Sequence, residues 1–364
     1  MPDILDYKCP QCGGKLEFDA GLQKMKCPYC DGVFEMDALK KKDDGLETGT
    51  PDAPQPAASD AAWETPSEQW QDSGFSAYVC KSCGGEIISD ENTIATSCPY
   101  CGNPVVLAGR VSGMLKPQYV IPFKLDKKEA KAQLKKFVSS KKFAPSLFKS
   151  ENKLEEIKGI YVPYWLFDSK TDAAMQFTGT RVRTWSDRDY NYTETSFFDV
   201  FRAGSMRFEN IPVDGSTKMP DDLMESLEPF DFREAVDFQT AYLSGYLADK
   251  YDVSAETSAQ RANERTEASA VSALRDTVTG YATVTAKEQD IHISDGQSKY
   301  ALYPVWLLNT TYNGKKYTFA MNGQTGKFIG NLPISGGKLA AFFGGLSAGI
   351  GAVVFVLGMV AGLF

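Results

Sequence analysis

The sequence predicts an α+β protein that begins with two small cysteine-rich β modules and ends in an apolar helix. Three observations support this. All eight cysteines lie in four Cys-x-x-Cys pairs near the N-terminus, strand-like segments alternate with capped helical patterns in the middle, and the last 26 residues carry no charge. The predicted domains are two modules at 1–37 and 78–110, a linker at 38–77, an α+β domain at 115–335 and a terminal helix at 339–364.

The two cysteine-rich modules follow one repeated pattern. Cys-x-x-Cys-Gly-Gly at residues 9–14 recurs at 80–85, Cys-Pro-Tyr-Cys at 27–30 recurs at 98–101, and 14 residues separate the inner cysteines in both copies. The equal spacing indicates that each copy forms a site of its own. Two such turns bring four sulfurs around one ion, the tetrahedral environment that Zn²⁺ prefers. The predicted ligands are Cys9, Cys12, Cys27 and Cys30 for one ion, and Cys80, Cys83, Cys98 and Cys101 for the other.

The predicted role of both zinc ions is structural. Four thiolates leave no open coordination position, so the metal folds the module and does not activate water. The glycine pair after each first turn permits a positive φ, and the residues between the turns then form the short hairpin of a zinc ribbon. Iron also binds four thiolates and is the alternative metal. A redox dithiol is disfavoured because it usually occurs singly beside a βαβ pattern.

The composition of residues 38–77 predicts a disordered linker between the two modules. The stretch is rich in Pro, Ala, Ser, Asp and Glu, and it buries too little apolar surface to offset its ordering entropy. We therefore expect the modules to move independently. Trp63 and Trp70 do not fit this composition. Incidental exposure or docking on a module is the favoured explanation, and a short partner-binding motif is the alternative.

Residues 115–335 predict the main domain, with mostly antiparallel strand pairing. Asp126 and Glu129 have capping-box spacing at the start of a helix, and Ser254 begins an Ala-rich helix over 254–277. A further helix is expected at 239–250. Strands are expected at 157–167, 175–185, 193–208, 278–294 and 300–330, and tight turns at Asn313-Gly314 and Asn322-Gly323.

A shorter repetition lies inside this domain. Pro163, Trp165 and Leu166 recur in the same order as Pro304, Trp306 and Leu307. A proline at the start of a strand followed by an inward tryptophan suits two similar sheet edges. Core packing is the favoured explanation, and an aromatic groove for a ligand is the alternative.

The chain offers few candidates for catalysis. His292 is the only histidine, which removes many acid–base and metal-dependent enzyme classes, and its isoleucine neighbours predict an ordinary strand residue. The segment Asn322 to Gly326 is Gly-rich but lacks the Lys-Ser/Thr ending of a phosphate loop, so it predicts a turn. We therefore expect that the protein is not an enzyme and assign no catalytic or cofactor-binding residue.

The charge of the chain disfavours nucleic acid as a partner. The net charge is -8 and the pI is near 5.0, whereas proteins that bind phosphate backbones usually carry a basic excess. Residues 181–192 mix arginines with aromatic residues, as single-strand binders do, but interleaved acidic residues favour a solvated hairpin face. A zinc-ribbon protein that binds nucleic acid at the membrane is the alternative function.

The apolar segment 339–364 predicts a transmembrane helix, because about 20 residues suffice to cross a bilayer. Gly345/Gly349 and Gly358/Gly362 have small-xxx-small spacing, which predicts either a homo-oligomer or a span without a fixed partner. No secretory signal pattern follows the N-terminus, and lysines precede the apolar segment. We therefore expect a single-pass protein of the cell membrane with cytoplasmic N-terminal domains, where cysteines favour metal over disulfides.

The motifs also resemble known families. Cys-x-x-Cys-Gly-Gly with Cys-Pro-Tyr-Cys resembles the TFIIB-type zinc ribbon. The second module, "GIYVPYWLFD" (159–168), "YLSGYLADKYDV" (242–253) and "NGQTGKFIGNLP" (322–333) resemble a bacterial family of membrane-anchored zinc-ribbon proteins, the YdjG-like type, over roughly residues 78–364.

This second resemblance implies a non-enzymatic, cytosol-facing membrane protein. The family is associated with phage-shock-type envelope-stress proteins and flotillin-like partners. The expected function is therefore a membrane-anchored adaptor that recruits or scaffolds other proteins at the bilayer.

Overall fold

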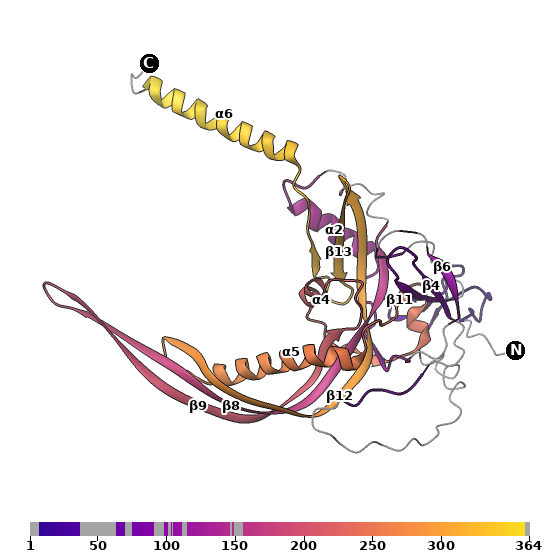
Figure 1. Cartoon of the computed structure of the whole chain (residues 1–364). Helices are drawn as coiled ribbons and strands as arrows, with labels where there is room; N and C mark the ends of the chain where they lie inside the picture. The colour runs from indigo at the N-terminus through magenta and orange to yellow at the C-terminus, as the bar shows by residue number, and fades with distance from the viewer. Residues whose placement is uncertain are drawn as a thin grey trace.

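A computed structural model describes residues 7–36, 63–69, 75–90, 98–100, 103, 105–110, 115–145, 148 and 156–360. The described residues form a three-stranded sheet, a mostly antiparallel eleven-stranded sheet and helices. A long apolar helix and a long curved β arm project from the body (Figure 1). The predicted α+β class, with mostly antiparallel pairing, is confirmed.

The first cysteine module, residues 7–36, forms the small sheet. Its strands are β1 (Glu17–Asp19), β2 (Lys24–Lys26) and β3 (Val33–Phe34), paired in that order. Leu16, Phe18 and Met25 are its buried hydrophobic side chains other than Tyr7, Ala20 and the cysteines. Because so small a sheet is marginally stable by itself, the module requires support from a metal ion, from a neighbouring domain, or from both.

The second cysteine module belongs to the large sheet. Its strands are β5 (Glu86–Asp90), β4 (Phe75–Val79) and β6 (Val106–Arg110), with β4 in the middle. Strand β5 also pairs with β11 (Leu247–Asp249) of the main domain. The expected independent movement of this module is therefore not met, because backbone hydrogen bonds join its edge strand to the main sheet.

Two long antiparallel strands, β8 (Lys158–Ser186) and β12 (Thr283–Tyr312), are the centre of the large sheet. Strand β9 (Asn191–Asp214) pairs with most of β8 on its other side. The distal parts of these three strands leave the body as the curved arm (Figure 1). The sequence predicted shorter strands with breaks near 168–174 and 295–299, but the chain passes these points as register shifts, between Phe167 and Ser169 and between Ser294 and Gln297.

Helix α5 (Ala255–Asp276) lies along one face of the arm. Ser254 caps its first turn, as predicted, through its hydroxyl to the N–H of Thr257. Small residues, including Ala262 and Ala270, form the buried stripe of the helix, and Ala270 packs in one cluster with Phe177 of β8. Small side chains allow this close approach of helix and strands.

Helix α2 (Lys127–Ser140) also begins as predicted. The Asp126 side chain accepts from the N–H of Glu129, and the Glu129 side chain accepts from the N–H of Asp126, so the capping box is confirmed. Leu134 and Val138 form part of the buried face of this helix.

The helix predicted at 239–250 is wrong. The segment forms a short 3₁₀ helix, η4 (Thr240–Leu243), followed by β11. Gly245 lies between them with a φ of 88°, a conformation that stops helix propagation. A helix that the sequence did not predict, α4 (Asp221–Leu227), buries Met224 and Leu227.

Short elements complete the large sheet. They are β7 (Tyr119–Val120), β10 (Val236–Asp237), β13 (Lys315–Asn322) and β14 (Phe328–Gly330). The 3₁₀ helix η3 (Phe232–Glu234) precedes β10 in the chain. The main path of the sheet is β10-β7-β12-β8-β11-β5-β4-β6, to which β9, β13 and β14 attach. Asn313 and Gly314 have φ values of 50° and 75°, which confirms the tight turn between β12 and β13.

The two tryptophans of the Pro-x-Trp-Leu motifs are core residues. Trp165 is 1% exposed and Trp306 is 4% exposed. Their indole nitrogens donate to the carbonyl oxygens of Val253 at 2.8 Å and Leu125 at 3.0 Å. The core-packing explanation is therefore confirmed. His292, as predicted, is a strand residue of β12.

Part of the predicted linker lies against the main domain. The Trp63 ring packs edge-on against Phe167, with 4.8 Å between ring centroids, and Glu64 pairs with Gln297. Trp63 therefore docks on the main domain, and not on a cysteine module as the sequence suggested. Trp70 and most of the predicted linker lie outside the described residues.

Helix α6 (Gly336–Val360) is the apolar helix that extends from the body (Figure 1). Its segment Gly336–Leu357 is long and apolar enough to cross a membrane. The mean hydropathy of this segment is 2.1, and none of it is buried against the rest of the described protein. The base of the helix is held by the loop after α2. Ser335 N donates to Phe143 O at 2.8 Å, Lys338 Nζ donates to Ala144 O at 2.6 Å, and Phe342 packs on Phe143.

Candidate metal centres

Four sulfur atoms meet in the first module. The Sγ atoms of Cys9, Cys12, Cys27 and Cys30 all lie within 4.8 Å of one another. Cys9 and Cys30 are 3.5 Å apart, as are Cys12 and Cys27. These separations are too long for disulfide bonds of about 2.05 Å. A tetrahedron with zinc–sulfur bonds of about 2.3 Å has sulfurs about 3.8 Å apart, so the arrangement fits such an ion.

The backbone around the first cysteine pair explains the glycines that follow it. Cys9 N donates to Gly14 O at 2.6 Å, and Gly13 N donates to Cys9 O at 2.8 Å. Gly13 has a φ of 73°, which favours glycine, and a Cβ on Gly14 would lie 2.6 Å from the Tyr29 ring. The Gly-Gly pair therefore allows the loop to turn back and the tyrosine to lie over it.

The close sulfur atoms of the first module have thiol pKa values that are shifted in opposite directions. Burial raises the pKa of Cys27, but hydrogen bonds from the N–H groups of Cys30 and Tyr29 lower it to about 7. The N–H of Gly32 lowers the pKa of Cys30, but the neighbouring sulfurs of Cys9 and Cys12 outweigh it and raise the pKa to about 12. Four thiolates at this distance therefore require a cation to offset their mutual repulsion.

The second module has the same turn geometry. Cys80 N donates to Gly85 O and Gly84 N donates to Cys80 O, both at 2.8 Å, and Gly84 has a φ of 71°. The Sγ atoms of Cys80, Cys83 and Cys98 lie within 4.8 Å of one another. Cys101, the fourth predicted ligand, lies outside the described residues. Three of the four predicted sulfurs are therefore together and could hold a metal ion.

The tyrosine of the Cys-Pro-Tyr-Cys motif has opposite environments in the two modules. Tyr29 is 76% exposed, whereas Tyr100 is 9% exposed. The first module thus presents its tyrosine to solvent. The second module turns the matching residue toward the main domain, where its hydroxyl lies near Asp249 of β11.

Asp249 is a buried carboxyl group that the sequence did not single out. It is 1% exposed, and its Oδ2 accepts from the Ser216 hydroxyl at 2.6 Å. Burial raises the pKa of Asp249 to about 7, although the Ser216 hydrogen bond favours the charged form. Burial also raises the pKa of Asp214 well above its ordinary value. Nothing in the local sequence marks these residues, because their burial follows from sheet pairing.

The first module docks on the main domain through the η4 segment. The Tyr7 hydroxyl lies 2.5 Å from Thr240 Oγ1, and the Ser244 hydroxyl donates to Leu16 O at 2.7 Å. The Phe18 ring packs edge-on against Tyr242 at 5.0 Å. The docking surface therefore combines hydrogen bonds with buried aromatic area, and the sequence analysis did not predict it.

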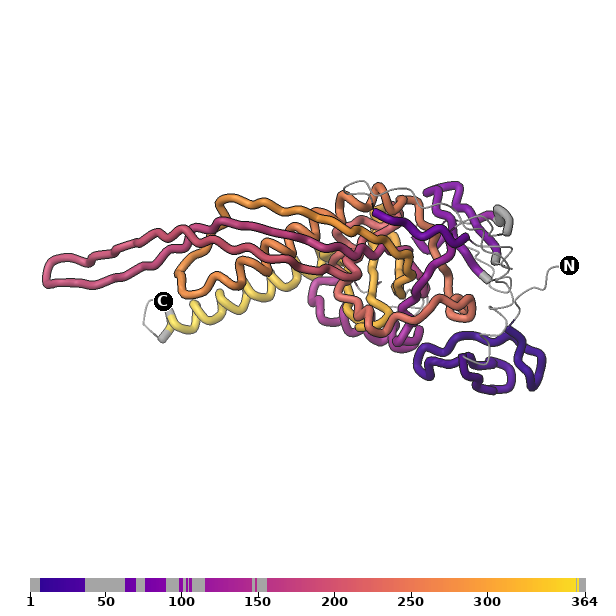
Figure 2. Tube along the Cα trace, turned by 90° about the horizontal axis from the view of Figure 1, so that it is seen from below, coloured from indigo at the N-terminus to yellow at the C-terminus, as the bar shows by residue number. Residues whose placement is uncertain are grey.

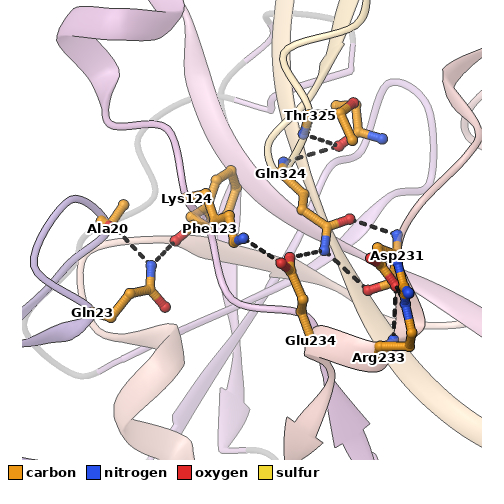
Figure 3. A network of polar contacts seen from close by, with 10 residues as sticks. Ala20, Gln23, Phe123, Lys124, Asp231, Arg233, Glu234, Gln324 and Thr325 are labelled. Atoms are coloured by element: carbon orange, nitrogen blue, oxygen red, sulfur yellow. Dashed lines mark hydrogen bonds and ion pairs between the residues drawn. The ribbon is translucent and has the colours of Figure 1, made fainter.

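A polar network extends this docking contact (Figure 3). Gln23 Nε2 donates to Ala20 O at 2.5 Å within the module and to Phe123 O at 2.7 Å in the main domain. The next residue, Lys124, pairs with Glu234, which also accepts from Gln324. The network thus runs from the first module to the turn after β13.

The lysines on the first module have acidic neighbours. Ion pairs join Lys15 to Glu17 at 3.9 Å, Lys24 to Glu35 at 2.5 Å and Lys26 to Asp31 at 3.2 Å. Such surface pairs contribute little stability. Their effect is that the described surface of the module has no cluster of unpaired cations for a phosphate backbone.

Comparison with known proteins gives one informative match. No family model matches the chain, and no solved structure matches it. The chain is 36% identical over 322 residues to the uncharacterized protein YdjG of Bacillus subtilis (strain 168), and the alignment covers 75% of this chain and 94% of that protein. At this identity and coverage, the chain belongs to the family of the Bacillus subtilis protein YdjG.

Proposed function

We propose that this protein is a membrane-anchored adaptor, in which two zinc ribbons of the TFIIB type hold a protein-binding surface on the cytosolic side of the bilayer. The observation that carries the proposal is the first cysteine module. It combines a closed set of four sulfurs with an exposed Tyr29, and it is docked on a domain that continues into α6.

Zinc is the proposed ion in both modules. The four sulfurs of the first module have separations that suit a tetrahedral ion, and they leave no position for a water ligand. The metal therefore supports the fold of a sheet whose strands have only two or three residues. Cys101 is the proposed fourth ligand of the second ion.

The proposed partner is a protein. Tyr29, Leu22 and Val33 are 76%, 51% and 44% exposed on the first module, where large apolar side chains favour a protein surface. The paired lysines of the same module weigh against nucleic acid as a partner. By the family resemblance, the candidates are flotillin-like or phage-shock-type proteins of an envelope stress response.

The proposed topology has α6 across the cell membrane and the remaining domains in the cytoplasm. Lys327 lies before α6 and Lys338 lies in its first turn, and positive charge favours the cytoplasmic side. Gly345 and Gly349 are exposed along α6, with open space where a Cβ would be. They are the proposed contact if α6 associates with a second copy.

The adaptor function is tested by photocrosslinking in cells of the source organism. A photoreactive phenylalanine replaces Tyr29 in one strain and Lys287 in another, because Lys287 is exposed on the arm, far along the chain from the first module. We expect one or a few specific protein adducts from position 29 and none of the same proteins from position 287.

The zinc requirement is tested in the same strain. Adding Cys9→Ser and Cys12→Ser removes two ligands of the first ion, and we expect the adducts from position 29 to disappear while the protein stays in the membrane fraction. Adducts that persist without these ligands would contradict ribbon-mediated recruitment. Photocrosslinked adducts with DNA or RNA whose yield falls as the salt concentration rises would favour the nucleic-acid alternative.

A further inference from the structure

The end of the β arm carries an unusual number of exposed aromatic side chains. Among the described residues outside α6, seven of the exposed large hydrophobic side chains fall within residues 182–201. They are Val182, Trp185, Tyr190, Tyr192, Phe197, Phe198 and Phe201, with exposures between 37% and 72%. Single exposed hydrophobic residues are ordinary, but a concentration of this kind marks an interaction surface.

The main domain covers the arm only up to the end of the hairpin, residues 182–192. Helix α5 packs on the arm as far as Phe177 and Val200. Beyond them, Arg181 Nε donates to Gly280 O at 3.2 Å, and the Arg181 guanidinium lies over the Tyr281 ring. Farther along the hairpin, the described strand residues 182–186 pair only with residues 191–195 of β9, because the pairing of β12 with β8 ends at Thr180.

The arm and α6 extend toward the same side of the molecule. In Figure 1 and in the perpendicular view of Figure 2, the β8–β9 turn and the C-terminal end of α6 lie on one side of the body, and the two cysteine modules lie on the other. The direction of α6 is held at its base by the contacts of Ser335, Lys338 and Phe342 with the loop after α2. A bilayer that contains α6 is therefore within reach of the arm.

The residues at the end of the arm are those that favour the interface between lipid and water. The rings of Trp185 and Tyr192 stack at 5.5 Å with an interplanar angle of 14°, and the Arg183 guanidinium lies 5.6 Å from the centre of the Trp185 ring. Trp and Tyr are enriched at headgroup level, and arginine keeps its charged end in water while its stem covers apolar surface.

The distribution of these side chains over the hairpin favours a bilayer over a protein partner. The strand register places Trp185, Tyr192 and Phe198 on one face and Val182 and Phe197 on the other. A protein that covers one face leaves the other in water, whereas a lipid interface surrounds the end of the hairpin.

The charge of the segment shows which force would hold it at the bilayer. Residues 181–202 contain four arginines (181, 183, 188 and 202) and four acidic residues (187, 189, 194 and 199), so the net charge is 4 − 4 = 0. One of the acids, Asp187, accepts from the N–H groups of Asp189 and Tyr190 and shapes the turn. Attraction to anionic lipid is therefore weak, and burial of aromatic area is the main contribution.

We propose that the end of the β8–β9 hairpin, with Trp185, Tyr190 and Tyr192 at its centre, is a second membrane contact that enters the headgroup region of the bilayer spanned by α6. This contact fixes the orientation of the main domain at the membrane, since two separate anchors restrict rotation that one helix permits. The inference rests on the membrane insertion of α6 proposed above.

The first experiment measures whether Trp185 reaches lipid. The full-length protein is reconstituted in phosphatidylcholine vesicles with and without lipids brominated near the headgroup, and the fluorescence of Trp185→Phe is subtracted from that of the wild type. We expect the Trp185 component to be quenched at least twofold. Resistance of the protein to alkaline extraction reports the insertion of α6 independently.

The two measurements separate the two proposals. An inserted protein with no quenching of Trp185 overturns the hairpin contact and leaves the insertion of α6 standing. A protein that alkaline buffer extracts overturns both. Quenching that requires anionic lipid overturns the aromatic mechanism, because the segment has no net charge.

The second experiment uses trypsin on protein in nanodiscs that hold one chain each. Arg183 and Arg188 are exposed cleavage sites next to the three central aromatics. We expect at least tenfold faster cleavage at these sites in a variant with Trp185→Ala, Tyr190→Ala and Tyr192→Ala than in the wild type. The matched control carries Thr184→Ala, Thr193→Ala and Thr195→Ala, which are exposed threonines of the same hairpin, and should stay protected.

The outcomes of this experiment distinguish the occupants of the surface. Equal cleavage of the aromatic variant, the threonine control and the wild type overturns the proposal. Protection that appears only when two chains share a disc overturns it in favour of contact between copies of the chain. Hydrogen exchange of β12 confirms that each variant retains the folded arm.

Discussion

At the scale of single residues, Tyr29 and Tyr100 show how far a motif determines its environment. Both belong to Cys-Pro-Tyr-Cys, and both rings lie near the glycine pair of their module. Yet Tyr29 is 76% exposed and Tyr100 is 9% exposed. The spacing of the cysteines predicted the sulfur clusters because the turns are local. The surroundings of the tyrosines depend on docking, which the motif does not encode.

The buried Asp249 predicts that stability depends on pH. Its pKa is raised to about 7 in the folded protein, so between about pH 4 and 7 the folded state holds more protons at this site than the unfolded state. The free energy of unfolding should therefore fall as pH rises through this range, by up to about 4 kcal/mol from this group. Asp249→Asn should weaken this pH dependence. The part that remains should come from Asp214, whose pKa is also raised by burial.

The measurement is the urea unfolding midpoint of wild type and Asp249→Asn in mild detergent at pH 5 and pH 8. The variant should gain stability relative to the wild type at pH 8. The control is Asp222→Asn, an exposed carboxyl group in α4, which should follow the wild type. A variant with the same pH slope as the wild type would show that Asp249 is not the titrating group.

The proposed zinc sites allow a second residue-scale prediction. Cys9→Ser should lower the bound zinc from two ions to one per chain, because the first site then has three sulfurs. Residues 7–36 should exchange their amide protons faster, since the metal supports their small sheet. Zinc analysis and hydrogen exchange by mass spectrometry give both readouts. Retention of two ions, or faster exchange throughout β8 and β12, would contradict separate sites.

At the scale of elements, helix α5 depends on its stripe of small residues. Ala270 is fully buried against the arm, whereas Ala268 is exposed on the same helix. Ala270→Leu should lower the free energy of unfolding by about 1–3 kcal/mol through overpacking, and it should loosen the arm from the helix. Ala268→Leu is the matched control and should be close to neutral. Equal stability of the two variants, measured by thermal unfolding, would contradict the packing.

The elements also show which parts of the fold were predictable. Both predicted helices that begin at a capping residue, Asp126 and Ser254, are present, because capping is a local interaction. The helix predicted at 239–250 failed because Gly245 and pairing with β8 and β5 override local preference. The strands of the arm were predicted too short. Register shifts often mark the end of a strand. Here β8 continues past them because it is paired with β12 on one side and β9 on the other.

At the scale of the whole molecule, the two cysteine modules are joined to the main domain in different ways. The second module continues the sheet through β5 and β11, so its position is fixed by backbone hydrogen bonds. The first module is a separate sheet, held on the η4 segment mainly by side chains and by one backbone hydrogen bond, from Phe18 N to Ser244 O. The first module is therefore the part that can leave the body without breaking the main sheet.

The Gln23 side chain tests this difference. It donates to Ala20 O and to Phe123 O, and it lies at the edge of the docking contact. Gln23→Ala removes both hydrogen bonds but no metal ligand. We therefore expect two zinc ions per chain as in the wild type, and faster amide exchange in residues 240–244, which face the module. Leu22→Ala is the control, since Leu22 is 51% exposed and adjacent in sequence.

The expected size of this effect follows from the chemistry of the contact. Only the bond to Phe123 O joins the module to the main domain. A neutral hydrogen bond contributes about 1 kcal/mol, so its loss should speed local opening of the docked module about fivefold. The variant should not change exchange in β5 and β11, because backbone pairing holds the second module. If exchange at 240–244 stayed at the wild-type rate, the hydrophobic contacts of Phe18 and Tyr242 would be sufficient to dock the module. If β11 also opened, the two modules would be coupled through the main domain.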